Sequence, residues 1–241
     1  PPAPAASRAW NPSISLFVVF GSETEIDTVW NKLIEGGKAL MPYDTYPWAK
    51  KYGWLQDRFG LSWQLSWNED HSAAQKITPL LMFTKSMAGK AKEAIEMYVS
   101  IFPNAKVDML VPYAPGDGDT EGFVKHSRFT LAGQNFMAMD SSGSHEFGFN
   151  EAVSLTVSCE TQNEIDYYWE KLSAVPEAEQ CGWLKDTYGV SWQIVPQVMY
   201  EMMMSGDKEK IARVTHAFLK MKKFDVAKLK DAYEGKERHD L

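Results

Sequence analysis

The side chains best suited to acid–base chemistry fall in one segment, FVKHSRFTL, at residues 123–131. If this segment is a strand, alternation puts His126, Arg128 and Thr130 on one face of it. His126 could then move protons near neutral pH, and Asp140, at the end of the next segment, could orient the imidazole. The alternative is a polar strand surface in contact with water, because antiparallel sheets commonly leave one face wet. His126 and Asp140 are therefore the candidate catalytic residues, with both interpretations open.

Two glutamines occupy the same place in a repeated segment. YGWLQDRFGLSWQL, at residues 52–65, and CGWLKDTYGVSWQI, at residues 181–194, are identical at eight of the thirteen positions that start from the glycine. The last polar residues of the two copies are Gln64 and Gln193. Such an amide can bond backbone groups across a hairpin, or it can orient the carbonyl or hydroxyl of a ligand in a pocket that has few polar groups.

Aromatic side chains gather close to the first copy of this repeat. The segment MPYDTYPW, at residues 41–48, is aromatic and polar together, and it is either a lid over an aromatic ligand or a loop that only fills space. The candidate ligand-binding residues are therefore four aromatic residues, two amides and one guanidinium: Tyr46, Trp48, Trp54, Trp63, Gln64, Gln193 and Arg128.

The elements that would position these residues are themselves repeated. An apolar strand at residues 13–20 precedes an amphipathic helix at 25–33, and the extended segments that follow end in the repeated hairpin. Residues 152–194 follow the same plan, and residues 76–140 form a third unit between the two. Each unit is predicted as strand, helix and three strands. After Pro196 the pattern becomes helical, so we expect an α+β fold with a helical tail.

Composition narrows the class of protein. The formal net charge is −7 and the basic residues form no long run, which argues against a nucleic-acid surface. No apolar run reaches the ~20 residues of a membrane helix. Two cysteines are too few for a disulfide framework, and they favour reduced thiols in a cytoplasmic protein. Residues 1–10 are predicted to be a disordered, proline-rich lead-in.

The amino-acid sequences of several segments resemble those of a known family. EMYVSIFPNAKV, FTLAGQNFMAMD, FGFNEAVSLTVSCET and YGWLQDRFGLSWQL are similar to the PhnB-like branch of the vicinal oxygen chelate superfamily, often labelled 3-demethylubiquinone-9 3-methyltransferase. This superfamily includes glyoxalase I, ring-cleaving dioxygenases and bleomycin-resistance proteins. The resemblance, which covers residues 11–235, implies that pairs of units curve one mixed sheet around a pocket.

An odd number of units departs from that paired pattern. We expect residues 11–68 to be the second half of a first domain whose partner half is absent. Residues 69–76 would then be a linker, residues 77–197 a second domain of two units, and residues 198–241 a helical tail. An unpaired sheet edge is adhesive, so we expect a homodimer.

The resemblance also implies where a divalent metal would bind in the enzymes of the superfamily. Their ligands, usually His, Glu or Gln, lie on the first strand and on a late strand of each unit. Those places fall near Ser15, Leu80 and Ser154, and at Gln64 and Gln193. Serine and leucine are poor ligands and glutamine brings no charge, so we expect no metal. The sequence also lacks a glycine-rich turn between a strand and a helix, so we expect no S-adenosylmethionine and no other cofactor.

These expectations lead to one preferred function and two alternatives. The preferred function is a metal-free small-molecule pocket protein that binds an apolar or aromatic ligand, with any activity being a proton transfer or a lyase- or isomerase-type step. The first alternative is a metal-dependent enzyme of the glyoxalase or dioxygenase type. The second is a sequestration protein of the resistance type that has no catalytic activity.

Overall fold

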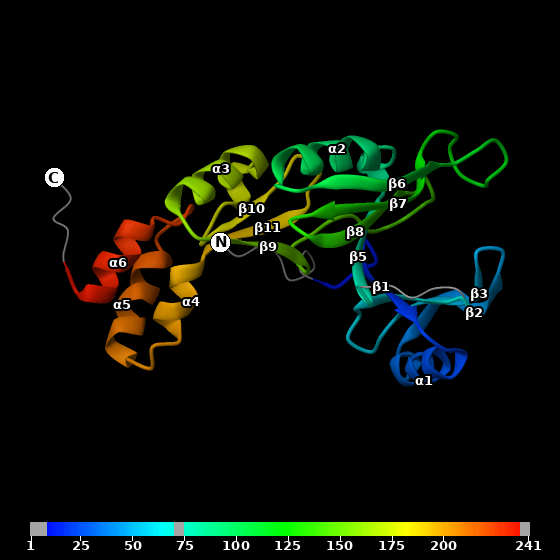
Figure 1. Ribbon diagram of the computed structural model, residues 1–241, viewed down its shortest axis with the longest axis horizontal. Helices are drawn as coiled ribbons and strands as arrows, with labels where there is room; N and C mark the ends of the chain where they lie inside the picture. Colours follow the sequence, from blue (N-terminus) through cyan, green and yellow to red (C-terminus); the bar gives the residue numbers. More distant parts are fainter. Residues whose placement is uncertain (1–8, 70–74, 237–241) are drawn as a thin grey trace. The chain divides into compact units, whose positions relative to one another are not determined.

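The computed structural model describes residues 9–69 and 75–236 (Figure 1). The predicted lead-in at residues 1–10 and linker at 69–76 lie largely outside the described residues. The chain divides into two compact units between Ala152 and Val153. None of the described helices is both long enough and apolar enough to cross a membrane.

The first unit is built on one eight-stranded sheet whose strand order is β2-β3-β4-β1-β5-β8-β7-β6. Helix α1 follows β1, and helix α2 follows β5 after a short 3₁₀ turn. The bounds are β1 Ile14–Phe20, α1 Glu23–Ile34, β2 Lys38–Tyr46, β3 Ala49–Gln56, β4 Ser62–Trp67, β5 Ile77–Phe83, η2 Lys85–Met87, α2 Ala91–Ile101, β6 Lys106–Pro112, β7 Val124–Leu131 and β8 Gln134–Asp140.

The centre of this sheet is the antiparallel pair of β1 and β5, in which Ser15 lies opposite Leu80. Strand β1 is also parallel to β4, and β5 is parallel to β8. The pairing of the repeats therefore differs from the expected one. The repeat at residues 76–140, which contains β5 to β8, completes the sheet of the repeat at residues 13–67. Because both edges of β5 are already paired, the expected closed domain of residues 77–197 is not the arrangement that the structure describes.

Helix α1 forms where the sequence combines a cap with an apolar stripe. The Ser22 hydroxyl accepts a hydrogen bond from the Glu25 backbone N–H at the start of the helix. Ile26 and Trp30 are buried against the sheet. A Cβ on Gly53 would lie 2.3 Å from the Trp30 ring, so only glycine permits this contact in β3.

The second unit has a smaller sheet of order β10-β11-β9. Its elements are β9 Ser154–Cys159, α3 Gln162–Leu172, η3 Pro176–Ala178, β10 Trp183–Lys185 and β11 Ser191–Pro196. This repeat therefore has three strands where four were expected. The short connection after α3 contains Pro176, which has no N–H for a ladder, and it forms a 3₁₀ turn instead of a strand.

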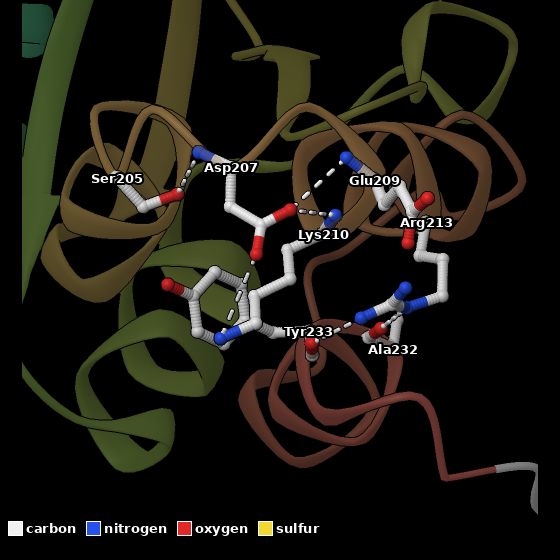
Figure 2. Close-up of polar contacts among 7 residues, drawn as sticks. All are labelled: Ser205, Asp207, Glu209, Lys210, Arg213, Ala232 and Tyr233. Carbon is white, nitrogen blue, oxygen red and sulfur yellow. Dashed lines mark hydrogen bonds and ion pairs between the residues drawn. The ribbon is translucent and has the colours of Figure 1, made fainter.

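Three helices follow β11, where the sequence predicts a helical tail: α4 Gln197–Met203, α5 Lys208–Phe218 and α6 Val226–Glu234. Figure 2 shows how α5 and α6 are joined. The Asp207 carboxylate accepts hydrogen bonds from the first backbone N–H groups of α5, and the Arg213 guanidinium donates to the carbonyls of Ala232 and Tyr233 at the end of α6. The last carbonyls of a helix lack partners within it, so Arg213 ties α5 to α6. The α+β class with mixed sheets and C-terminal helices is confirmed.

Candidate functional site

The repeated hairpin is held by a carboxylate inside its own turn. Asp57 Oδ2 accepts a hydrogen bond from the Trp63 indole at 3.0 Å, and Asp186 Oδ2 accepts one from the Trp192 indole at 2.9 Å. The other oxygen of each carboxylate accepts two backbone N–H groups of the turn. In both copies, the aspartate and the tryptophan together fix the hairpin turn, which explains why these residues recur in the repeated segment.

This contact also places Trp63. Its side chain belongs to the apolar cluster under α1, together with Leu65 and Trp30. Phe17 and Gln64 are partners in the β1–β4 register and lie on the opposite face from Trp63, because neighbouring residues of a strand point to opposite sides. The expectation that Trp63 lines a pocket with Gln64 is therefore corrected, since the two side chains lie on different faces of β4.

Gln64 is buried, and both ends of its side-chain amide are used. Its Nε2 donates to the Ser15 hydroxyl at 2.9 Å, and its Oε1 accepts from the Tyr52 hydroxyl at 2.8 Å. Burial raises the pKa of Tyr52 well above its usual value, which keeps the phenol a hydrogen-bond donor. These bonds join strands β4, β1 and β3, so the geometry supports a structural role for Gln64.

The aromatic segment near residue 46 lies beside this network. The rings of Tyr46 and Trp48 stack with centroids 4.9 Å apart, and both meet the Tyr52 ring edge-on, at 5.5 and 6.0 Å. Trp48 is 56% exposed. The segment is thus a surface aromatic group that packs on Tyr52, the residue whose hydroxyl is hydrogen-bonded to Gln64.

An apolar cluster lies on the same sheet face as Gln64. We call this the helix-free face, because strand alternation places it opposite the residues that pack on α1 and α2. Leu80, Met82 and Met137 are its buried members. Its partly buried neighbours are Phe17, Trp54, Met139 and Phe147. Trp54 is anchored by its indole N–H, which donates to the Ser62 hydroxyl at 2.8 Å.

His126 and Arg128 also face this side, since Arg128 is the register partner of Met137. Burial and the nearby Arg128 charge lower the pKa of His126, so its neutral form is favoured. Asp140 points to the other face. Its carboxylate accepts backbone N–H groups of Gly89, Ala91 and Val124 at 2.8, 3.1 and 2.9 Å. The expected orientation of His126 by Asp140 is therefore corrected, because Asp140 binds the N-terminal end of α2.

The sheet order separates the remaining candidates. Gln64 on β4 and His126 on β7 have β1, β5 and β8 between them. At ~4.8 Å per strand, this is about 19 Å along the sheet. Gln193 belongs to the other sheet, where its Nε2 donates to Ser154 Oγ at 2.7 Å.

A protein-family model described as 3-demethylubiquinone-9 3-methyltransferase matches residues 5–66 and 75–195. The chain belongs to this family. Among curated proteins there is no match.

Several solved structures are similar to this chain. A PhnB protein from Bacillus cereus is 42% identical, with a TM-score of 0.44, over 51% of this chain and 99% of that protein. A protein from Staphylococcus aureus is 30% identical, with a TM-score of 0.24, over 52% of this chain and 100% of that protein. Glyoxalase I from Zea mays is 10% identical, with a TM-score of 0.48, over 80% and 71% of the two chains.

The positions at which the resemblance places a divalent metal offer few donor atoms in this chain. Ser15 and Gln64 are hydrogen-bonded to each other, and Leu80 offers no donor atom. Within residues 9–69 and 75–236, no three His, Cys, Asp or Glu side chains are grouped to hold an ion. A divalent site needs several coordinated donors, so the residues described do not fit one.

The family description names a methyltransferase, but the described residues contain no glycine-rich cofactor-binding loop of the Rossmann type. The glycine-containing segment GDGD, at residues 116–119, joins β6 to β7. The glycine-rich cofactor loop of a Rossmann-type fold instead joins a strand to a helix. The segment therefore gives no support to nucleotide-cofactor binding.

A cleft that the sequence did not predict lies in the second unit. Its volume is about 480 Å³, and its lining includes Gln162, Asp166, Lys220, Lys223, Phe224 and Lys228. Lys223 is ion-paired with Asp166, and Gln162 bonds the backbone of Phe224 and Val226. Its polar groups thus largely bind one another. No motif signals this cleft, because α3 and the tail segment meet only through tertiary packing.

Proposed function

We propose that this protein is a metal-free small-molecule pocket protein that binds an apolar or aromatic ligand on the helix-free face. The observation that carries the proposal is the apolar cluster itself. Its buried members continue outward into the partly exposed rings of Phe17 and Trp54. Aromatic rings gain favourable contacts with one another beyond the area that they bury. A flat apolar ligand would be held between these rings.

Few polar groups lie beside the cluster, and most of them are already hydrogen-bonded to one another. Tyr52, Gln64 and Ser15 bind one another, and Ser62 receives the Trp54 indole. A site of this kind recognises shape and apolar area more than hydrogen-bonding pattern. The second candidate function, sequestration without turnover, is favoured by the separation of His126 from Asp140, because no acid–base pair is assembled. A metal-dependent reaction has the least support, since the donor set is poor.

We also propose a cellular compartment and an oligomeric state for the protein. The two cysteines are free thiols, with Cys159 buried. This fits a cytoplasmic protein, because that compartment keeps thiols reduced. We further propose a homodimer as the working assembly, since closed two-fold dimers are the commonest oligomers.

The test is a binding titration with the aromatic probe 2-naphthol, followed by quenching of the probe fluorescence. Trp54→Leu should weaken binding at least about tenfold, because the ring against which the probe packs is removed. Trp183→Leu, at the equivalent place in the second copy of the repeat, is the matched control and should bind like the wild type. Equal weakening in both variants, or in neither, would reject this site. Consumption of the probe by the wild type would favour catalysis over sequestration.

A further inference from the structure

The loop that follows β8 brings a serine and a histidine together. The Nε2 atom of His145 lies 2.8 Å from the Ser141 hydroxyl oxygen, and both side chains are half-buried. A nucleophilic side chain within hydrogen-bond reach of a base is the usual arrangement for covalent catalysis. His126 and Asp140 do not form such a pair, but Ser141 and His145 do. All four residues belong to the first compact unit.

This pair lies on the helix-free face. The Ser141 backbone N–H donates to the Phe83 carbonyl at 2.9 Å, which continues the ladder of β5 and β8 by one residue. Met139 belongs to the cluster on that face, and alternation turns Ser141 to the same side. The His145 ring packs on the Phe147 ring with centroids 4.9 Å apart, and Phe147 packs against the same cluster. An apolar ligand on this cluster would therefore have the Ser141 hydroxyl beside it.

A carboxylate lies beside the pair. Asp119 accepts hydrogen bonds from the Ser142 backbone N–H and hydroxyl, at 3.2 and 2.6 Å. Burial opposes the ionisation of this carboxyl, but hydrogen bonds from Ser142, Thr120 and Ser141 hold its pKa below the ordinary value. Negative charge close to Ser141 stabilises the imidazolium that forms when His145 takes the proton of the serine.

The missing side chain of Gly143 leaves room beside the pair. A Cβ at this position would lie 3.2 Å from His145 Nε2 and 3.5 Å from Ser141 Oγ, so a larger residue would crowd both atoms. The Gly143 backbone N–H also points toward the Ser141 hydroxyl, with nitrogen and oxygen 3.4 Å apart. A backbone N–H next to a nucleophile is the kind of donor that stabilises the oxyanion of an acyl-transfer reaction.

We propose that this protein hydrolyses carboxylic esters of aromatic alcohols, with Ser141 as the nucleophile and His145 as the general base. Ser141 Oγ bonds to the ester carbonyl carbon while His145 Nε2 takes the hydroxyl proton. The bond to the aromatic alcohol then breaks, and the leaving oxygen takes that proton from His145. Water, deprotonated in turn by His145, attacks the acyl group, and the proton returns to Ser141 as the carboxylic acid leaves. The inference rests on the proposed function, because the aromatic part of the ester occupies the apolar cluster.

The test substrate is 2-naphthyl acetate, whose hydrolysis releases the fluorescent probe 2-naphthol. The wild type should hydrolyse it with saturation kinetics. Ser141→Ala and His145→Gln should each lower kcat at least about a hundredfold, since a general base contributes that much or more, and both should still bind 2-naphthol. Ser144→Ala, at an exposed position of the same loop, is the control and should keep the wild-type rate.

Covalent labelling tests the nucleophile in the unaltered chain. Phenylmethanesulfonyl fluoride should sulfonylate Ser141 of the wild type, with loss of fluoride, and peptide mass spectrometry locates the label; His145→Gln should lose it. Binding of 2-naphthol without hydrolysis of its acetate would overturn the esterase inference and leave the binding proposal standing. Hydrolysis that survives in Ser141→Ala, or a wild type unlabelled at Ser141, would overturn the assigned nucleophile. Absence of both binding and hydrolysis would reject both proposals.

Discussion

The Gln64 side-chain amide donates a hydrogen bond to the Ser15 hydroxyl across 2.9 Å, although the residues are 49 positions apart. The same bond joins Gln193 to Ser154 at 2.7 Å in the second unit. Each bond links the last strand of a repeat unit to its first strand. The resemblance places metal ligands of the superfamily at these positions. In this chain, the same positions hold a neutral hydrogen bond within the sheet.

The first prediction concerns the stability that this bond provides. Gln64→Met keeps the length of the side chain but leaves the Ser15 and Tyr52 hydroxyls without their buried partner. Unsatisfied buried groups cost about 1–3 kcal/mol each, so the free energy of unfolding should fall by about 2–6 kcal/mol. Gln193→Met removes the hydrogen bond to Ser154 from a partly buried site and should cost about 1 kcal/mol. Urea denaturation measures both; equal losses would contradict the account.

The second prediction concerns the turn carboxylates. Asp186 is 1% exposed and accepts the Trp192 indole together with two backbone N–H groups. Asp186→Asn replaces an acceptor by a donor facing donors, and it should destabilise the second unit by about 2–3 kcal/mol. Asp57→Asn is the matched control, since Asp57 is only half-buried, and it should cost less. Thermal unfolding followed by tryptophan fluorescence checks the order, and a reversed order would show that burial does not decide the cost.

The third prediction concerns pH. Burial lowers the pKa of His126 below its ordinary value of 6.5. Between the two values, the unfolded chain binds more protons at this position than the folded chain, so stability rises with pH there. The contribution of His126 is therefore complete above pH 6.5 and declines as the pH falls below it. His126→Gln should flatten this part of the curve of unfolding free energy against pH. A curve of unchanged slope would contradict the lowered pKa.

The fourth prediction concerns metal and cofactor. The purified protein should carry no stoichiometric Zn, Ni, Mn or Fe, because Gln64 and Ser15 bind each other and Leu80 offers no ligand atom. Calorimetry with S-adenosylmethionine should give no heat of binding. Elemental analysis with about one ion per chain would contradict the first statement. A dissociation constant in the micromolar range, about −8 kcal/mol, would contradict the second.

The sequence predicted the repeat, its helices and its hairpins because each depends on local signals. The Ser22 cap, the apolar spacing of α1 and the turn at Asp57 are all readable within a few residues. The pairing of repeat units was not readable, because β1 has the same alternation whichever strand covers its edge. The role of Asp140 was missed for a related reason. Asp140 is the last residue of β8, the strand that pairs with the His126 strand β7, but strand alternation turns its carboxylate to the α2 side.

Methionine methyl groups would report directly on a ligand bound to the helix-free face. Met82, Met137 and Met139 belong to the cluster on that face, whereas Met202 and Met203 pack among the tail helices. Nuclear magnetic resonance spectra of isotope-labelled methionine methyls, recorded while 2-naphthol is added, distinguish the two groups. We predict that the signals of Met82, Met137 and Met139 shift in a saturable way while those of Met202 and Met203 do not shift. Shifts confined to the tail methionines, or no shift at all, would contradict it.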